Sequence, residues 1–434
     1  MHKLSLRSAI LIILNVMVGF GIFVNTTQLA QIAGFLGFAC YLLVAALMVP
    51  LMSCMAVIMA RHSGGFYVYG AKEIHPLAGF ISAWIFFTGK LASAALIIHV
   101  VVQLLQGLLP ALAQIPILAL DACIIILFCL LNMLHMRVGS SFATGFFSLK
   151  LLPLLFAICA GLYLLSSATI APQTFIWSGI PQGIPFVVYA FTGFETACSL
   201  SRSIEDDQRN GPRAIFWAFS IAVTINVLYQ LLFFIGTSGD LMSKQSYLDA
   251  FPTLLAHLFP AAPALAQQIT NFLHLALATA ALGGSYGILF SNHWNLHVLA
   301  EHGHLPARSW FLRTNRHGIP VLGIIVEALL CIGYLVCTNG AQKPLQQINA
   351  LACTIAYTIS VLALLAAVQR KQVATPAWLV YAALGSCSIF LATCVRNFWI
   401  FGAGALIGYS LIVAFGLLLY VMTRRMQQTF PTQN

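Results

Sequence analysis

Four ionisable side chains lie inside long apolar stretches of this sequence, namely Lys90, Lys150, Glu195 and Glu327. A charge in the hydrocarbon core of a membrane is costly, so such a residue usually pairs with another group or serves a function. Ion pairing and proton transfer are therefore the chemistry that these four residues offer.

Glycines interrupt two of the apolar stretches. The first interruption is Gly19-Phe20-Gly21-Ile22-Phe23, and the second is Tyr189-Ala190-Phe191-Thr192-Gly193-Phe194-Glu195. Closely spaced glycines favour unwinding of a helix, and unwound backbone at membrane depth usually lines a binding site. The alternative is that Gly19 and Gly21 only allow two helices to cross closely.

The two interruptions offer opposite kinds of backbone group. Freed amides at the positive end of a half-helix suit a carboxylate, and we assign this role to Phe20, Gly21 and Ile22. Freed carbonyls suit an ammonium group, and we assign this role to Tyr189, Ala190 and Phe191. Together the two demands describe an amino acid zwitterion.

Composition identifies the class of element that must position these residues. The chain has 434 residues, of which 60% are hydrophobic and 7% are charged, and its mean hydropathy is +0.93. These values predict an all-α polytopic membrane protein and exclude an ordinary soluble globule. A span needs about 20 apolar residues, and twelve stretches are expected to cross: 8–31, 35–60, 78–107, 117–135, 142–165, 183–203, 212–237, 265–298, 319–337, 345–368, 376–395 and 399–423.

The distribution of Lys and Arg predicts the orientation. With the N-terminus in the cytoplasm, most basic residues fall in cytoplasmic loops, and only Lys244, Lys343 and Arg396 fall outside. We therefore expect both termini in the cytoplasm, a cell-membrane location and an uncleaved first span. This asymmetry accounts for most of the net charge of +10, so no nucleic-acid partner is expected.

The chain is predicted to form one membrane domain over residues 1–425, with a short cytoplasmic tail at 426–434. Breaks in spans one and six are what two inverted five-helix halves would give. The halves are residues 8–165 and 183–368, and the two helices of 376–423 are additional. The eleven cysteines form no CxxC pair and read as buried hydrophobes, so no disulfide framework, metal site or cofactor is expected.

Several motifs, in this order and spacing, resemble the amino acid, polyamine and organocation (APC) superfamily of transporters, which has the LeuT-type fold. They are Gly19 to Phe23, Ser63-Gly64-Gly65-Phe66-Tyr67-Val68-Tyr69, Gly193-Phe194-Glu195, Glu205 to Ile215, Leu305-Pro306 and Gly318-Ile319-Pro320. The resemblance implies twelve helices with the first and sixth unwound at mid-membrane, and secondary transport of an amino acid or amine by alternating access.

The resemblance also implies roles for particular residues. Gly19 to Ile22 would hold the substrate carboxylate, Tyr189 to Phe191 its amine, Glu195 would sit beside the second break, and Tyr286 would line the pocket. Lys150 matches a span-five lysine of proton-linked members, and a lysine that is alternately desolvated and hydrated can bind and release a proton. The structural alternative is a permanent cation that bridges helices.

Some residues depart from the family pattern. Phe20 replaces the small residue usual between the two glycines, and Lys90 is unexpected in span three. Lys90 can pair with Glu195 or Glu327, or neutralise an acidic substrate side chain. Glu327 can pair with a neighbouring helix, and His99 and His274 read as neutral core groups.

The expected function is proton-coupled amino acid uptake, with amino acid or amine exchange as the alternative. A membrane enzyme would need a nucleophile or carboxylate cluster, and a channel would favour polar rings, so both are disfavoured. No P-loop pattern is present, and ATP-driven transport is not expected. The oligomeric state is left open between monomer and homodimer.

Overall fold

The computed structural model describes residues 5–62, 65–134, 147–166, 174–195 and 207–429. The expected spans 142–165 and 183–203 and the motif 205–215 therefore lie partly outside the described residues, and residues 63–64 and 430–434 lie wholly outside them. The described elements are α-helices with short 3₁₀ turns, and two isolated bridges, Gly34 with Phe175 and Thr314 with Pro320, are the only strand-like pairings among them.

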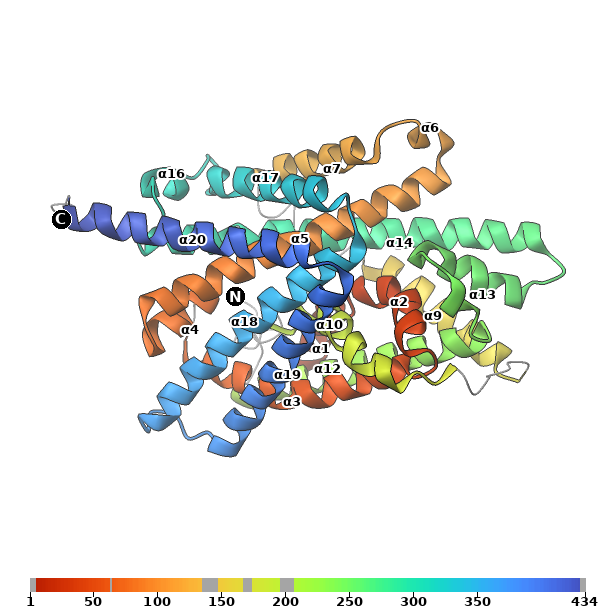
Figure 1. Cartoon of the computed structure of the whole chain (residues 1–434), viewed down its shortest axis with the longest axis horizontal. Helices are drawn as coiled ribbons and strands as arrows, with labels where there is room; N and C mark the ends of the chain where they lie inside the picture. The colour runs from red at the N-terminus through yellow and green to blue at the C-terminus, as the bar shows by residue number, and fades with distance from the viewer. Residues whose placement is uncertain (1–4, 63–64, 135–146, 167–173, 196–206, 430–434) are drawn as a thin grey trace. The chain divides into compact units, whose positions relative to one another are not determined.

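Eight helical segments in the described part of the chain are long and apolar enough to cross a membrane. They correspond to eight of the expected spans and involve α3 (Gly37–Arg61), α5 (Pro76–Leu108), α12 (Asp207–Gly236), α14 (Pro263–Asn292) with α15 (Trp294–Glu301), α17 (Val321–Thr338), α18 (Gln342–Gln369), α19 (Ala377–Phe401) and α20 (Ala403–Thr429). Two shorter apolar helices are α7 (Ile117–Asn132) and α9 (Phe147–Leu164). An all-helical multi-pass membrane protein is the result (Figure 1).

The chain divides into two compact units, and each has its own packing. The first unit comprises Met1–Met52, Val100–Pro116 and Thr144–Gly284. In it, α12 packs against both α9 and α1 (Leu6–Met17), and α2 (Gly21–Ala33) packs along α10 (Ile180–Phe191). Gly161 lets α9 approach α12, because an added Cβ would lie 2.7 Å from the Cβ of Leu232.

The second unit comprises Ser53–His99, Ile117–Ala143 and Ser285–Asn434. In it, α17 packs against α7, and α18 packs against α19 and against the short helix α4 (Gly65–Glu73). Helices α5 and α18 meet where Gly89 faces Ala352, and the Asn349 Nδ2 donates to the Gly89 carbonyl at 3.1 Å. Glycine removes the side chain that would otherwise hold these two helices apart.

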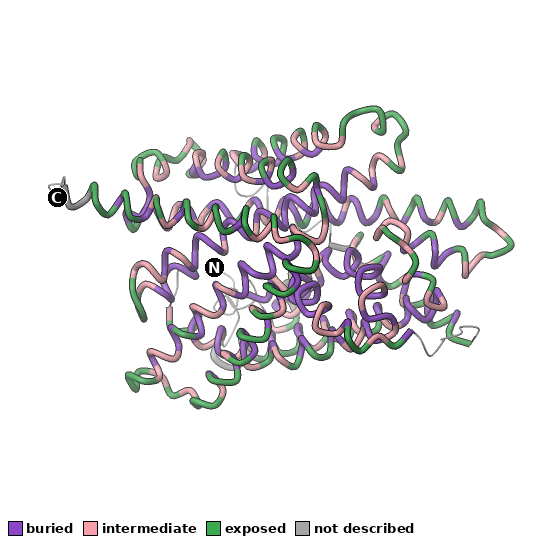
Figure 2. The backbone as a smooth tube through the Cα atoms, viewed as in Figure 1, coloured by how far each residue is buried: buried purple, intermediate pink, exposed green. Residues whose placement is uncertain are grey.

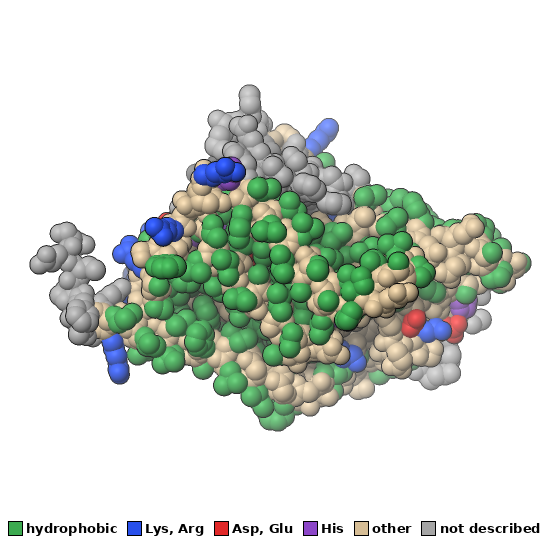
Figure 3. Space-filling model, turned by 90° about the horizontal axis from the view of Figure 1, so that it is seen from above, with side chains coloured by type: hydrophobic (Ala, Val, Ile, Leu, Met, Phe, Trp, Pro, Cys, Tyr) green, Lys and Arg blue, Asp and Glu red, His purple; other side chains and the backbone are tan. Residues whose placement is uncertain are grey.

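Burial is one-sided along several helices (Figure 2). Helix α20 is the extreme case, because only 17% of its most apolar 18-residue window is buried, and Ile407, Leu411, Phe415 and Leu418 are exposed. Hydrophobic side chains dominate the face in Figure 3, with few charged ones among them. Exposed apolar surface of this extent suits lipid contact.

Candidate functional site

The first helix break lies between α1 and α2. Helix α1 ends at Met17, the Gly19 N–H donates to the Met17 carbonyl at 2.9 Å, and α2 begins at Gly21. Within the described part of the chain, the N–H groups of Phe20, Gly21 and Ile22 donate no hydrogen bond. The N-terminus of α2 therefore offers three amides and the positive end of a helix dipole.

The second break follows α10. Thr192 is extended and Gly193 has φ +125°, a conformation that favours glycine and stops the helix. The Thr192 N–H and Oγ1 both donate to the Tyr189 carbonyl, at 3.2 and 2.8 Å. The Tyr189 carbonyl thus already accepts hydrogen bonds, whereas the carbonyls of Ala190 and Phe191 at the end of the helix accept none from outside the helix among the described residues.

The two broken ends meet within the first unit. A Cβ at Gly21 would lie 2.8 Å from the Cα of Ala190 and 3.2 Å from Cδ1 of Tyr189, so only glycine fits. One turn further on, the Asn25 Nδ2 donates to the Phe186 carbonyl at 2.7 Å and ties the two helices together. A helix N-terminus and a helix C-terminus are thus placed side by side.

Glu195 is buried beside the second break, where its Oε2 accepts from the Gly193 N–H at 2.8 Å. The Glu195 carboxylate therefore satisfies a backbone N–H that the end of the helix leaves free. Lys150 belongs to the first turns of α9 in the same unit and is half-buried.

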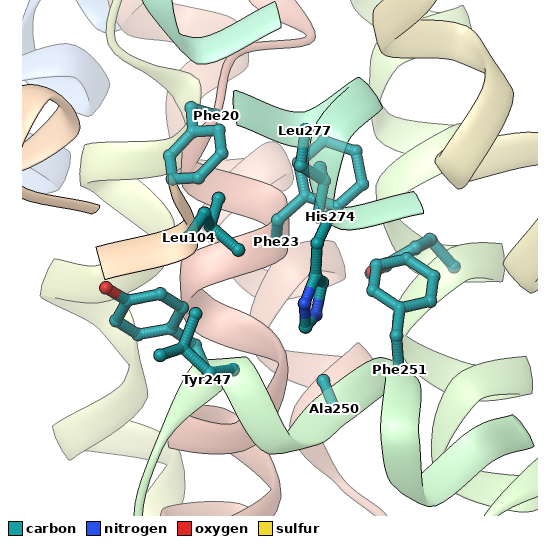
Figure 4. Close-up of a pocket in the computed structure, with 10 residues that line it drawn as sticks. Phe20, Phe23, Leu104, Tyr247, Ala250, Phe251, His274 and Leu277 are labelled. Atoms are coloured by element: carbon teal, nitrogen blue, oxygen red, sulfur yellow. The ribbon is translucent and has the colours of Figure 1, made fainter. Parts of the chain in front are cut away.

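A small cavity adjoins the first break (Figure 4). Its volume is about 10 Å³, roughly that of one water molecule. Most of its lining is aromatic or aliphatic: Phe20, Phe23, Leu104, Tyr229, Tyr247, Leu248, Ala250, Phe251, His274 and Leu277. The Phe23 and Tyr229 rings meet edge to face at 5.6 Å, and the Phe251 and His274 rings lie 6.4 Å apart.

Three other residues singled out in the sequence lie in the second unit. The Tyr286 ring is buried and packs 5.3 Å from Phe128. The Lys90 Nζ lies 5.3 Å from the Phe86 ring centroid, a cation–π distance. The Glu327 carboxylate lies 3.8 Å from His293.

Sequence reasoning missed two ionisable groups of the second unit. Asp121 is fully buried in α7, and its Oδ2 lies 2.7 Å from Nδ1 of His99. Asp121 carries the same signal as Glu195, an acid inside an apolar stretch, and could have been found by it. The other group is Glu73.

Glu73 is the centre of a charge cluster at the ends of α3, α4 and α18. Its carboxylate lies 2.7 Å from Arg61, 2.5 Å from His62 and 3.6 Å from Arg370. Burial raises the pKa of the Glu73 carboxyl, but the hydrogen bonds and charges of His62 and Arg61 outweigh it and hold that pKa below its ordinary 4.5. No group of three or more metal-ligating side chains is found among the described residues.

The apolar helices, the paired helix breaks and the lipid-facing surface define a multi-pass membrane protein. The sequence pattern of the family described as amino acid permease matches residues 4–423, so this chain belongs to that family. Its members are transporters and not enzymes.

Proteins with similar sequences are also transporters. The aromatic amino acid transport protein AroP of Salmonella typhimurium is 24% identical over 347 residues, which cover 74% of this chain and 72% of the relative. AroP of Escherichia coli K12 matches with the same identity and coverage. An uncharacterized transporter of Mycobacterium tuberculosis is 26% identical over 350 residues, 76% of this chain and 73% of the relative.

Proposed function

We propose that this permease is a secondary carrier that binds the amino acid zwitterion between the N-terminus of α2 and the C-terminus of α10. The observation that carries the proposal is the packing of Gly21 directly against Ala190. The substrate carboxylate accepts hydrogen bonds from the amides of Phe20, Gly21 and Ile22. The substrate ammonium donates to the carbonyls of Ala190 and Phe191.

The cavity beside Phe20 gives a reason to place aromatic amino acids first among the substrates. Five of its ten lining residues are Phe or Tyr, and the similar AroP proteins are named for aromatic amino acid transport. The cavity of about 10 Å³ is far smaller than an aromatic side chain, so the Phe20 ring must turn aside when substrate binds.

We further propose the twelve-span, inverted-repeat arrangement with both termini in the cytoplasm, and transport by alternating access in the cell membrane. The eight long helices, the two shorter ones and the two interrupted segments provide the twelve crossings. Breaks in the first and sixth crossings put one interrupted helix in each repeat, which is the pattern of this transport mechanism.

The proposed coupling ion is the proton, and the proposed carrier of it is Lys150. A lysine inside an apolar helix is stable without a charge while it is dry, and it takes up a proton when the site is hydrated. Substitution of Lys150 by Gln is expected to abolish uptake driven by a pH gradient. Unchanged uptake with unchanged pH dependence would remove Lys150 from the mechanism.

The test is uptake by purified protein in proteoliposomes, with radiolabelled aromatic, aliphatic and cationic amino acids and polyamines. Accumulation into empty vesicles under an inward proton gradient is the expected result and identifies a symporter. Uptake that requires preloaded amino acid identifies an exchanger and leaves Lys150 a structural cation. Absence of saturable uptake for every compound would contradict amino acid transport itself.

A further inference from the structure

Glu327 and His293 are two ionisable residues that are completely enclosed in the second unit. Their side chains are 0% and 1% exposed. Glu327 lies in α17, and His293 lies at the junction between α14 and α15. Gly323, four residues before Glu327, faces the His293 Cβ, so the backbone of α17 approaches this junction closely.

The carboxyl group of Glu327 has no hydrogen bond to any described residue, at either oxygen. The His293 Nδ1 lies 3.8 Å from Oε2 of Glu327, which is beyond hydrogen-bond length. That nitrogen donates instead to the Leu289 carbonyl at 3.1 Å, so it carries the ring hydrogen. Nε2 of His293 then has a free lone pair and no hydrogen-bond partner in the described part of the chain.

One neighbour of the pair, Asn292, offers the Glu327 carboxyl group a partial hydrogen bond. Its Nδ2 donates one of its two hydrogens to the Phe87 carbonyl at 3.0 Å and does not reach full hydrogen-bond geometry with Glu327. The titratable groups around the pair are the thiols of Cys129 and Cys331 and the imidazole of His297.

The two thiols contact backbone carbonyls, and the lysine of α5 contacts an aromatic ring. Cys129 and Cys331 direct their Sγ atoms toward the carbonyls of Ile324 and Leu91 at 3.8 and 3.6 Å. Helix α5 also carries Lys90, next to Leu91, and its Nζ lies against the Phe86 ring.

An ionised carboxylate in these surroundings would be a buried charge without a fully formed hydrogen bond from the described residues, and such a charge is strongly disfavoured. One proton on the pair removes the net charge, either on a Glu327 oxygen or on Nε2 of His293. Loss of that proton would leave a net negative charge in an apolar interior, so the proton can leave only when water reaches the site.

We propose that Glu327 and His293 form a proton-binding site, which holds one proton on the Glu327 carboxyl group while the site is dry and releases it to water when the site is hydrated. The site is distinct in sequence and in residue types from Lys150. Its part in substrate coupling rests on the proposed transport function, but its binding of a proton does not.

The direct test is infrared difference spectroscopy of the purified full-length protein, with H₂O and D₂O compared. A stretching band of a protonated carboxyl group is expected near neutral pH, with an isotope shift, and it should be lost in Glu327→Gln. The matched control is Glu301→Gln, because the Glu301 side chain is 52% exposed and should contribute no such band. A spectrum of Glu327→Gln that is identical to wild type would overturn the proposal.

Two further variants keep the test decisive if Glu327→Gln does not fold. Glu327→Asp retains a carboxyl group and should move the band without removing it. His293→Gln should keep the band but raise the pH at which half of it is lost, because the alternative proton acceptor of the pair is gone and the carboxylate has lost its neighbouring cation. A band that neither variant changes would also overturn the proposal.

The same variants in proteoliposomes address coupling. Glu327→Gln is expected to retain exchange of labelled amino acid between preloaded vesicles and medium. Its accumulation of amino acid under a proton gradient is expected to be at least tenfold lower than that of wild type. If wild-type protein transports no amino acid, the transport proposal fails and the infrared result still decides the proton site.

Discussion

The polar groups that stand out in the two units differ: they are backbone groups in the first unit and ionisable side chains in the second. In the first unit, the ends of α2 and α10 present backbone amides and carbonyls, and Gly21 brings them together. In the second unit, several ionisable side chains lie close to one another, as in the pairs His99 with Asp121 and His293 with Glu327 and in the Glu73 cluster. A backbone site depends on shape, whereas a side-chain site depends on protonation. The two should therefore respond differently to substitution and to pH.

The largest effect is expected from Gly21→Ala in the backbone site. The added Cβ would lie 2.8 Å from the Cα of Ala190, a backbone atom that cannot turn away. Overpacking of this kind costs about 1–3 kcal/mol, and about 1.4 kcal/mol is tenfold in affinity, so substrate Kd should rise roughly tenfold or more. Scintillation proximity binding with purified protein measures it.

Gly385→Ala is the control for this prediction, because no atom lies within 4 Å of a Cβ added at this helical position. It should bind substrate as wild type does. If Gly21→Ala also binds substrate normally at every pH, the ends of α2 and α10 are not the zwitterion site. The first unit would then hold no binding site made of backbone groups at this junction.

A smaller effect, on stability, is expected from Glu73→Gln in the side-chain cluster. The change removes the carboxylate shared by Arg61, His62 and Arg370 and should destabilise the protein by about 2 kcal/mol at neutral pH. Thermal unfolding in detergent, followed by tryptophan fluorescence, measures it. Glu301→Gln, at a half-exposed pair with His297, should stay within about 0.5 kcal/mol of wild type.

The sign of the pH dependence sharpens the same prediction. The folded-state pKa of Glu73 is lower than its ordinary 4.5. Its contribution is therefore complete above that ordinary value and is lost as the pH falls through the lowered value. The stability difference between wild type and Glu73→Gln should accordingly shrink toward acid. A difference that stays constant down to acid pH would show that the cluster acts by packing alone.

The smallest effect is expected from Tyr67→Phe. The Tyr67 hydroxyl lies 2.7 Å from Nε2 of His304, and loss of this buried hydrogen bond should cost about 1 kcal/mol. Burial, with the charges of Arg424 and His302, lowers the pKa of His304 from 6.5 to about 4. Its neutral form therefore stabilises the fold above pH 6.5, and this contribution is lost as the pH falls toward 4.

His304→Phe is the partner variant, because it removes the titrating ring. It should flatten the stability profile between pH 6.5 and 4 relative to wild type. Tyr381→Phe, at a 57% exposed ring, is the control for Tyr67→Phe. An equal loss of stability in Tyr67→Phe and Tyr381→Phe would show that the hydrogen bond between Tyr67 and His304 does not stabilise the fold.

Apolar length and glycine spacing were the parts of the fold that sequence could predict. Eight expected spans correspond to long apolar helices, and the breaks fall at Met17 to Gly21 and at Thr192 to Gly193. Both signals are local, since a run of apolar residues or a glycine pair acts on its own segment. The second break lies just past the predicted carbonyls because Thr192 caps Tyr189 through both its N–H and its hydroxyl.

Partners across helices could not be predicted in the same way. Arg61 reaches a glutamine 311 positions away, and no local pattern announces such a contact. His293 has several other histidines near it in the sequence, and its position beside Glu327 depends on the approach of α17 at Gly323. Identifying an ionisable residue is a sequence problem, whereas finding its partner requires the packed helices.

The close approach of Gly21 to Ala190 has a consequence for how this carrier can change over evolutionary time. Every residue except proline carries the same backbone amide and carbonyl, so other substitutions at Phe20, Ile22 or Phe191 alter the surroundings of the site without deleting its hydrogen-bonding atoms. Gly21 itself is fixed by the absence of space for a Cβ. If this junction binds the amino acid zwitterion as proposed, side-chain substitutions around it can change which amino acid is carried, while the backbone atoms that recognise the zwitterion stay the same.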